Sequence, residues 1–138
     1  MSDQDSGQRE SLIPAEADTA HAVELFFDGH PLGLQAHELV ALTLEGTGSF
    51  EVQVRRTQVA FRRRRGFAYL WLPGRWLPQS SAELVLSIAL PWADRSVRFK
   101  EIAHPTPHLW MHHLEVNDLA VLDGQVAAWL TEAWSAAG

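Results

Sequence analysis

The spacing of the apolar residues changes near Gly48, and this change restricts the fold more than any other feature of the chain. Beyond it, apolar and polar residues alternate along short segments separated by glycine, proline or arginine, which is typical of half-buried strands joined by turns. Before it, and again after Asp123, apolar residues recur every three or four positions, as in amphipathic helices. The sequence therefore predicts an α+β domain in which helices flank an antiparallel sheet.

The alternating segments predict a sheet of four to five strands. Alternation runs over 51–62, 67–72, 83–90 and 109–116, with a shorter piece at 98–102. Two N-terminal helices are expected, one from Asp18 to a stop at Gly29 and one over 34–45. A single C-terminal helix is expected from about Asp123, whose side chain should cap it.

Length and composition restrict the chain to one domain. A chain of 138 residues can bury one hydrophobic core but is too short for two. Residues 1–17 are polar and acidic with no apolar period, so we expect a disordered acidic tail followed by a single α+β domain over 18–138. The sequence has no cysteine, which excludes disulfides and thiolate sites. It also has neither a signal-peptide pattern nor a long apolar stretch, so we expect a cytoplasmic protein with no membrane partner.

The formal net charge of −6 hides an asymmetry along the chain. Up to Glu45, nine acidic residues accompany a single base, Arg9. From Arg55 to Arg75 the chain holds seven arginines and no acidic residue. The net acidity argues against general nucleic-acid binding, but this local basic window predicts contact with an anion.

The alternation also predicts how the hairpin in this window is aligned. If Arg62 lies opposite Phe67, then Val59 pairs with Leu70 on the face toward the core. The reverse face then carries a mixture of polar groups, rings and one small residue: Arg62, Phe67, Ala60, Tyr69, Gln58 and Trp71.

This basic-aromatic face is the first candidate site. Guanidinium groups bind phosphate or carboxylate through paired hydrogen bonds, and rings on a sheet face can stack bases. We therefore expect a non-enzymatic binding or interaction module for an anionic partner, whether a nucleic acid, a phosphate ligand or an acidic protein segment. The candidate ligand-binding residues are Arg55, Arg56, Arg62, Arg64, Arg65, Phe67, Tyr69, Trp71 and Arg75, with Arg63 and Trp76 in the same window.

Two alternatives remain open for this face. In one, the N-terminal helix covers the rings and the arginines form only a solvated hairpin tip. In the other, the acidic tail lies over the arginines, so that removing the tail would expose the site.

Histidines near the last strand form the second candidate, a metal site or the acid-base centre of a small enzyme. The group contains His104, with His108, His112, His113 and Glu115 as the candidate metal ligands. Adjacent strand residues point to opposite faces, so His112 and His113 cannot bind one ion without a bulge. We expect His112 to be a hydrogen-bonded histidine in the core or at an edge, and His113 to be more exposed.

A third alternative is a homodimeric structural domain. The segment 83–90 has leucine and isoleucine on one side and Val85, Ser87 and Ala89 on the other, where small residues leave room for a packing partner.

The sequence has no phosphate-binding loop, dinucleotide fingerprint, zinc-protease motif or nucleophile elbow. No cofactor is therefore expected.

Three segments follow one another over about residues 50–136: FEVQVRRTQVAFRRRRGFAYLWLP, AELVLSIAL and HLWMHHLEVNDLAVLDGQVAAWLTEAW. In these segments, and in their order and spacing, the sequence resembles a bacterial family known as domain of unknown function 5655. It implies a helix-flanked antiparallel sheet. It implies no activity and no functional residues.

Overall fold

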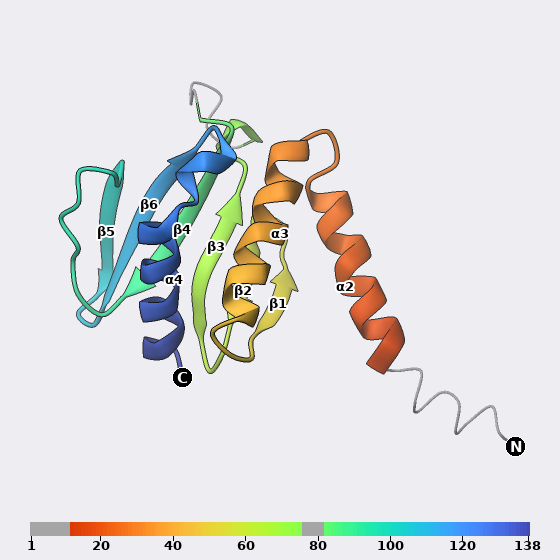
Figure 1. Ribbon diagram of the computed structural model, residues 1–138, viewed down its shortest axis with the longest axis horizontal. Helices are drawn as coiled ribbons and strands as arrows, with labels where there is room; N and C mark the ends of the chain where they lie inside the picture. Colours follow the sequence, from red (N-terminus) through yellow and green to blue (C-terminus); the bar gives the residue numbers. More distant parts are fainter. Residues whose placement is uncertain (1–11, 76–81) are drawn as a thin grey trace, which may run out of the picture.

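The change from helices to strands falls near Gly48, as predicted, between the end of α3 (Pro31–Glu45) and the start of β1 (Glu51–Val54). In the computed structural model, which describes residues 12–75 and 82–138, two helices precede a six-stranded antiparallel sheet and one helix follows it (Figure 1). This confirms the α+β class. The sheet has more strands than expected because a turn, closed by the Arg55 N–H donating to the Gln58 carbonyl, divides the alternating segment 51–62 into two strands.

The helices begin at or before their predicted starts. Helix α2 spans Leu12–Phe26, α3 spans Pro31–Glu45 and α4 spans Gly124–Ala136. The predicted disordered tail therefore overlaps α2 by six residues, 12–17, of which only the backbone is described, and its remainder lies outside the described residues. Proline is tolerated in a first turn, whose N–H groups lack helical partners, so Pro14 does not prevent the earlier start. Asp123 caps α4 as predicted, since its carboxylate accepts from the Val126 N–H.

The sheet places the chain's central strands between two edge strands. Its order is β1-β2-β3-β4-β6-β5, so β1 and β5 form the edges. The bounds are β1 Glu51–Val54, β2 Val59–Arg62, β3 Gly66–Trp71, β4 Leu84–Leu90, β5 Glu101–Thr106 and β6 Leu109–Val116.

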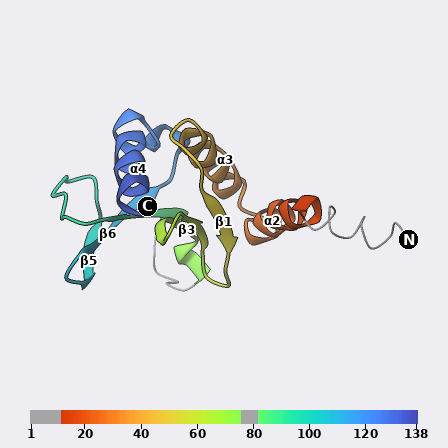
Figure 2. The same cartoon turned by 90° about the horizontal axis from the view of Figure 1, so that it is seen from below.

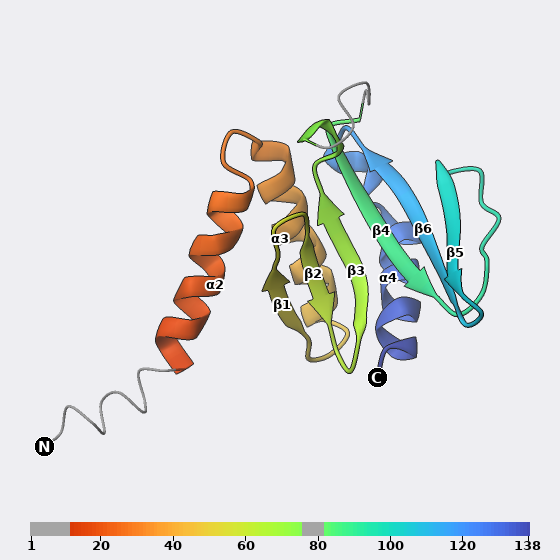
Figure 3. The ribbon, with the colours of Figure 1, turned by 180° about the vertical axis from the view of Figure 1, so that it is seen from behind.

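In the described part of the chain, helices cover one face of the sheet and leave the other face open. Helices α3 and α4 lie side by side on one face, and seen from behind the strands stand in front of both helices (Figures 2 and 3). Helix α2 lies beside the edge strand β1 and crosses neither face (Figure 3). We call the side under α3 and α4 the covered face and the opposite side the open face. The N-terminal helix therefore leaves the rings of the open face uncovered, unlike the first alternative above.

The core lies between the covered face and the two helices. Buried residues of α3 and α4, among them Val40, Leu44 and Leu130, join the inward residues of β2, β3, β4 and β6 in one apolar cluster. Because burial of apolar surface is the main favourable term in folding, this cluster holds the two layers together. No helix in the described ranges is long and apolar enough to cross a membrane.

The predicted hairpin alignment is correct except at its tip. Val59 pairs with Leu70 and Ala60 with Tyr69, as expected. Arg62, however, pairs with Gly66 and not with Phe67, because the register shifts after Phe61. The extra residue is Phe67. Such a bulge turns a side chain toward the other face, and Phe67 is fully buried in the core cluster. The prediction that Phe67 lies on the open face is therefore wrong.

Candidate functional site

The pairing of the strands builds a continuous row of side chains across the middle of the open face. Ala60, Tyr69, Ser87 and His113 are direct partners on neighbouring strands, and Glu101 follows opposite His113 on β5. Side chains at such positions lie close enough to interact. The face therefore carries arginines near β1 and β2, where Glu51 lies opposite Arg62, rings in the centre, and the carboxylates of Glu101 and Glu115 on β5 and β6.

Hydrogen bonds fix the Trp71 ring across this face. Its Nε1–H donates to the Ser87 Oγ at 2.9 Å, and the Ser87 Oγ lies 2.7 Å from the His113 Nδ1. The Trp71 and His113 rings meet edge to face with centroids 6.1 Å apart. Burial lowers the pKa of His113, an effect that the Glu101 charge opposes, so the imidazole is set up as a neutral acceptor for the Ser87 proton.

Tyr69 lies within the field of two arginines. Its hydroxyl lies against Gly66, so a Cβ atom at position 66 would force the Tyr69 side chain to move. Burial raises the pKa of the Tyr69 phenol, and the charges of Arg62 and Arg55 oppose the rise. Arg55 also donates to the Gln53 Oε1 at 2.7 Å, which orients its side chain along β1.

Other arginines of the predicted set serve the ends of the helices. Arg65 donates to the Ala136 carbonyl at 2.8 Å, at the end of α4, and Arg75 donates to the Phe26 carbonyl at 2.6 Å, at the end of α2. Arg63 donates to the Trp134 carbonyl and lies 3.7 Å from the centre of the Trp134 ring. The last turns of α2 and α4 carry no basic residue of their own, so these arginines supply the positive charge that a helix C-terminus favours.

The predicted arginine-rich surface is thus divided. Arg55 and Arg62 accompany Tyr69 and Trp71 at the open face, whereas Arg65, Arg75 and Phe67 lie elsewhere. Arg56 and Arg64 are exposed in turns, and their side chains have no hydrogen-bond or ion-pair partner within 12–75 and 82–138. Trp76 lies outside the described residues. The sequence contained one signal for this arrangement, because the last turns of α2 and α4 have no basic residue. Arginines from other segments could therefore be expected to bind the carbonyls at these helix ends.

The histidines do not converge on one site. His104 stacks on the Trp110 ring at 3.9 Å, His113 faces the open side, and His108 lines a cleft. His112 is fully buried, as expected, with its Nε2 accepting from the Asp94 N–H and its Nδ1 3.1 Å from the Ile88 carbonyl. Asp94, which the sequence did not single out, also accepts from the Trp129 Nε1 at 2.8 Å. Within the described ranges, no three histidine, aspartate or glutamate side chains are grouped to hold a metal ion.

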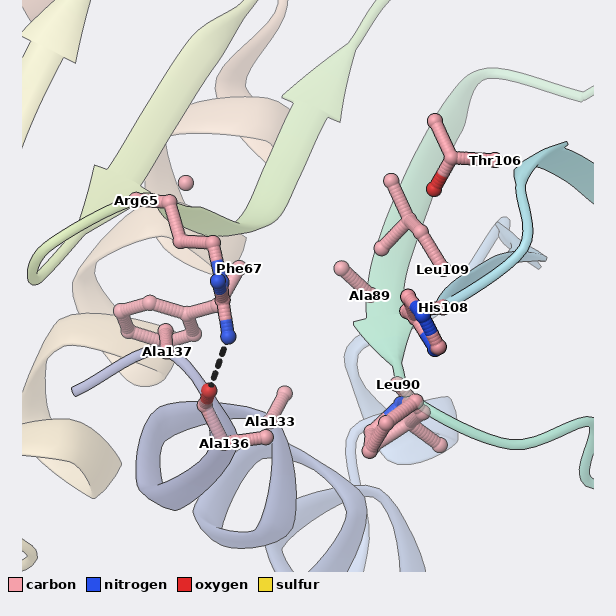
Figure 4. Close-up of a pocket in the computed structure, with 12 residues that line it drawn as sticks. Arg65, Phe67, Ala89, Leu90, Thr106, His108, Leu109, Ala133, Ala136 and Ala137 are labelled. Atoms are coloured by element: carbon pink, nitrogen blue, oxygen red, sulfur yellow. Dashed lines mark hydrogen bonds between the residues drawn. The ribbon is translucent and has the colours of Figure 1, made fainter.

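A cleft opens where β3 and β4 separate, near the end of α4 (Figure 4). Pairing between these strands ends at Ala68 and Ile88, although β4 continues to Leu90. The cleft has a volume of about 190 Å³. Arg65 and Phe67 lie on one wall and His108 and Leu90 on the other, with Ala133 of α4 at the base between them (Figure 4).

The comparisons with known proteins agree with the resemblance seen in the sequence. The chain matches no curated protein and no solved structure. The model of a family described as domain of unknown function (DUF5655) matches residues 27–137, a longer stretch than the resemblance covered. The match begins directly after α2 and takes in α3, the whole sheet and α4. Because it spans most of the chain, the protein belongs to the DUF5655 family.

Proposed function

We propose that the protein is a binding module for single-stranded nucleic acid, and that the nucleic acid lies on the open face, across the strands from β1 to β4. Tyr69 and Trp71 would stack bases, while Arg55 and Arg62 would bind phosphates. The observation that carries this proposal is the presence of two rings, one of them fixed by a hydrogen bond, beside two arginines on a sheet face that no described helix covers.

The rings meet the physical requirements of a stacking platform. Base stacking on an aromatic ring contributes about 1–3 kcal/mol per base and tolerates any sequence. A ring that is already fixed loses little freedom on binding, and Trp71 is held by its hydrogen bond to Ser87, while Tyr69 is half-buried beside Gly66. The carboxylates of Glu101 and Glu115 on β5 and β6 would repel phosphates and so direct the nucleic acid toward Arg55 and Arg62, where one carboxylate, that of Glu51, lies opposite Arg62.

The proposal predicts a weak but measurable salt dependence. Two phosphate contacts release few counterions, so the slope of log affinity against log salt should be about −1.4 for single strands. Fluorescence anisotropy with labelled oligothymidine and oligouridine, at about 50 and about 150 mM salt, would measure it. Negligible binding of both probes at the lower salt concentration, with and without residues 1–11, which precede α2, would rule the proposal out. Binding that appears only after these residues are removed would show that they cover the arginines.

Matched variants separate stacking from general charge. Tyr69→Leu should weaken binding by about 5- to 150-fold, as expected for the loss of one stacked base, whereas Trp71→Phe should retain most of the affinity because the ring remains. Arg55→Gln should weaken binding and flatten the salt slope, whereas Arg56→Gln removes the same charge from a turn and should have a smaller effect. Equal effects of the two arginine variants would mean that the protein attracts the strand only through its general field.

A further inference from the structure

The cleft beside Phe67 lies outside the surface proposed for nucleic acid. The bulge at Phe67 bends β3 where its pairing with β4 ends, and bulges of this kind often lie next to binding sites. Ala133 and Ala136 of α4, and Ala137 directly after it, line the cleft and leave it unfilled. The backbone geometry and the small side chains together create a hollow at the end of the sheet (Figure 4).

The cleft is apolar inside and basic at its mouth. Phe67, Leu90 and Ala133 are buried, whereas Arg65, His108 and Thr106 are exposed. The Arg65 Nη2 donates to the Ala136 carbonyl at 2.8 Å, which fixes the guanidinium at the rim. A guanidinium has five N–H donors, so Arg65 keeps donors for a ligand after making this bond.

We propose that this cleft binds a small monocarboxylic acid whose apolar body is a single ring or a short branched chain. The carboxylate would lie between Arg65 and His108, and the apolar body would lie against Phe67 and the α4 alanines. A planar carboxylate matches the guanidinium fork, and the apolar interior favours a ligand with a body over a bare anion.

Size and charge narrow the ligand further. An apolar cavity of about 150 Å³ accommodates benzene. The cleft, at about 190 Å³, is therefore matched to one ring with a carboxylate rather than to a nucleotide. The C-terminal end of α4 carries partial negative charge, which disfavours a phosphate dianion more strongly than a monoanion, and Arg65 offsets this charge at the Ala136 carbonyl.

Calorimetry on the full chain with simple probes tests the proposal. Benzoate should bind at least tenfold more tightly than acetate, which lacks the body, than benzamide, which lacks the charge, and than inorganic phosphate. Two-dimensional NMR should place the benzoate-induced shifts at Phe67, Ala89 and Ala133. Shifts spread over the surface, or equal affinity for benzoate and benzamide, would overturn it.

Variants locate the site independently of the proposed nucleic-acid surface. Arg65→Gln should weaken benzoate binding at least tenfold, and Arg64→Gln, its exposed neighbour, should leave binding unchanged. Ala136→Leu should fill the cleft and abolish binding. If that variant fails to fold, Arg65→Gln still decides the question, because retained affinity would refute the assignment. Tyr69→Leu should leave benzoate binding intact, so either proposal can fail without the other.

Discussion

Strand β4 shows how differently the two faces of this sheet are buried. All seven of its residues are buried. On the covered face Leu84, Leu86, Ile88 and Leu90 lie under α3 and α4, whereas Val85, Ser87 and Ala89 face the side that no described helix crosses. The second set is small, and larger neighbours such as Trp71 and His113 lie across it.

The two faces should therefore respond differently to substitution. The covered face depends on close packing, in which every removed methylene group leaves a cavity. The open face depends on a few oriented hydrogen bonds and on rings that lie at the surface. Changes on the covered face should alter stability, and changes on the open face should alter binding with a smaller effect on stability.

The largest expected difference is between two neighbours on β4. Leu86→Ala should reduce the free energy of unfolding by about 2–5 kcal/mol because Leu86 is fully buried under the helices. Ser87→Ala should reduce it by about 1 kcal/mol, the value of a typical hydrogen bond. Urea unfolding followed by circular dichroism measures both. A loss at Ser87 as large as that at Leu86 would show that the open face also contributes a packed core.

Acid should act on the covered face through His37. His37 belongs to α3, and its ring stacks on the Phe61 ring with centroids 5.2 Å apart. Burial lowers the pKa of His37 to about 4 from an ordinary value of 6.5. The unfolded chain therefore binds this proton more readily, and stability should fall as the pH drops from 6.5 to about 4, by up to about 3 kcal/mol. Unfolding curves over this pH range would show it.

The control for this pH effect is the exposed His21. His37→Phe should flatten the loss of stability between pH 6.5 and about 4, whereas His21→Gln should leave it unchanged. Burial also lowers the pKa of His113, so a smaller loss in the same direction should remain. The Asp123 carboxyl, whose pKa the Arg98 hydrogen bond lowers from 3.8, titrates below this window. An unchanged pH profile in His37→Phe would contradict the assignment.

Much of this contrast could be predicted from alternation alone. The core pairing of Val59 with Leu70 and the cap at Asp123 follow from local patterns, which a single sequence contains. Phe67 could not be placed because a bulge shifts side chains by one residue without changing the composition of the strand. The capping roles of Arg65 and Arg75 depend on helix ends far away in sequence, and the cleft depends on where two strands separate.

The adjacent residues His112 and His113 of β6 allow the covered and open faces to be compared at neighbouring positions. His112→Leu should cost about 1–3 kcal/mol because it leaves the buried Ile88 carbonyl and Asp94 N–H without their partner. His113→Leu removes one half-buried contact with Ser87 and should cost less. Thermal unfolding of both variants at neutral pH would compare them. A greater loss at His113 would mean that the polar row of the open face, and not the core histidine, stabilises the sheet.

The smallest expected effects separate two arginines that the sequence placed in one group. Arg75→Gln removes a charged cap from the Phe26 carbonyl and a contact at 4.9 Å with the Phe26 ring, so unfolding should become easier by about 0.3–1 kcal/mol. Within the described residues the Arg55 side chain makes one hydrogen bond, to the half-buried Gln53, so Arg55→Gln should change stability by less than about 0.5 kcal/mol while oligonucleotide binding weakens. Both variants should be tested for the free energy of unfolding and, by fluorescence anisotropy, for oligonucleotide binding. Arg75 belongs with the helices and Arg55 with the open face only if each variant changes one quantity and leaves the other unchanged.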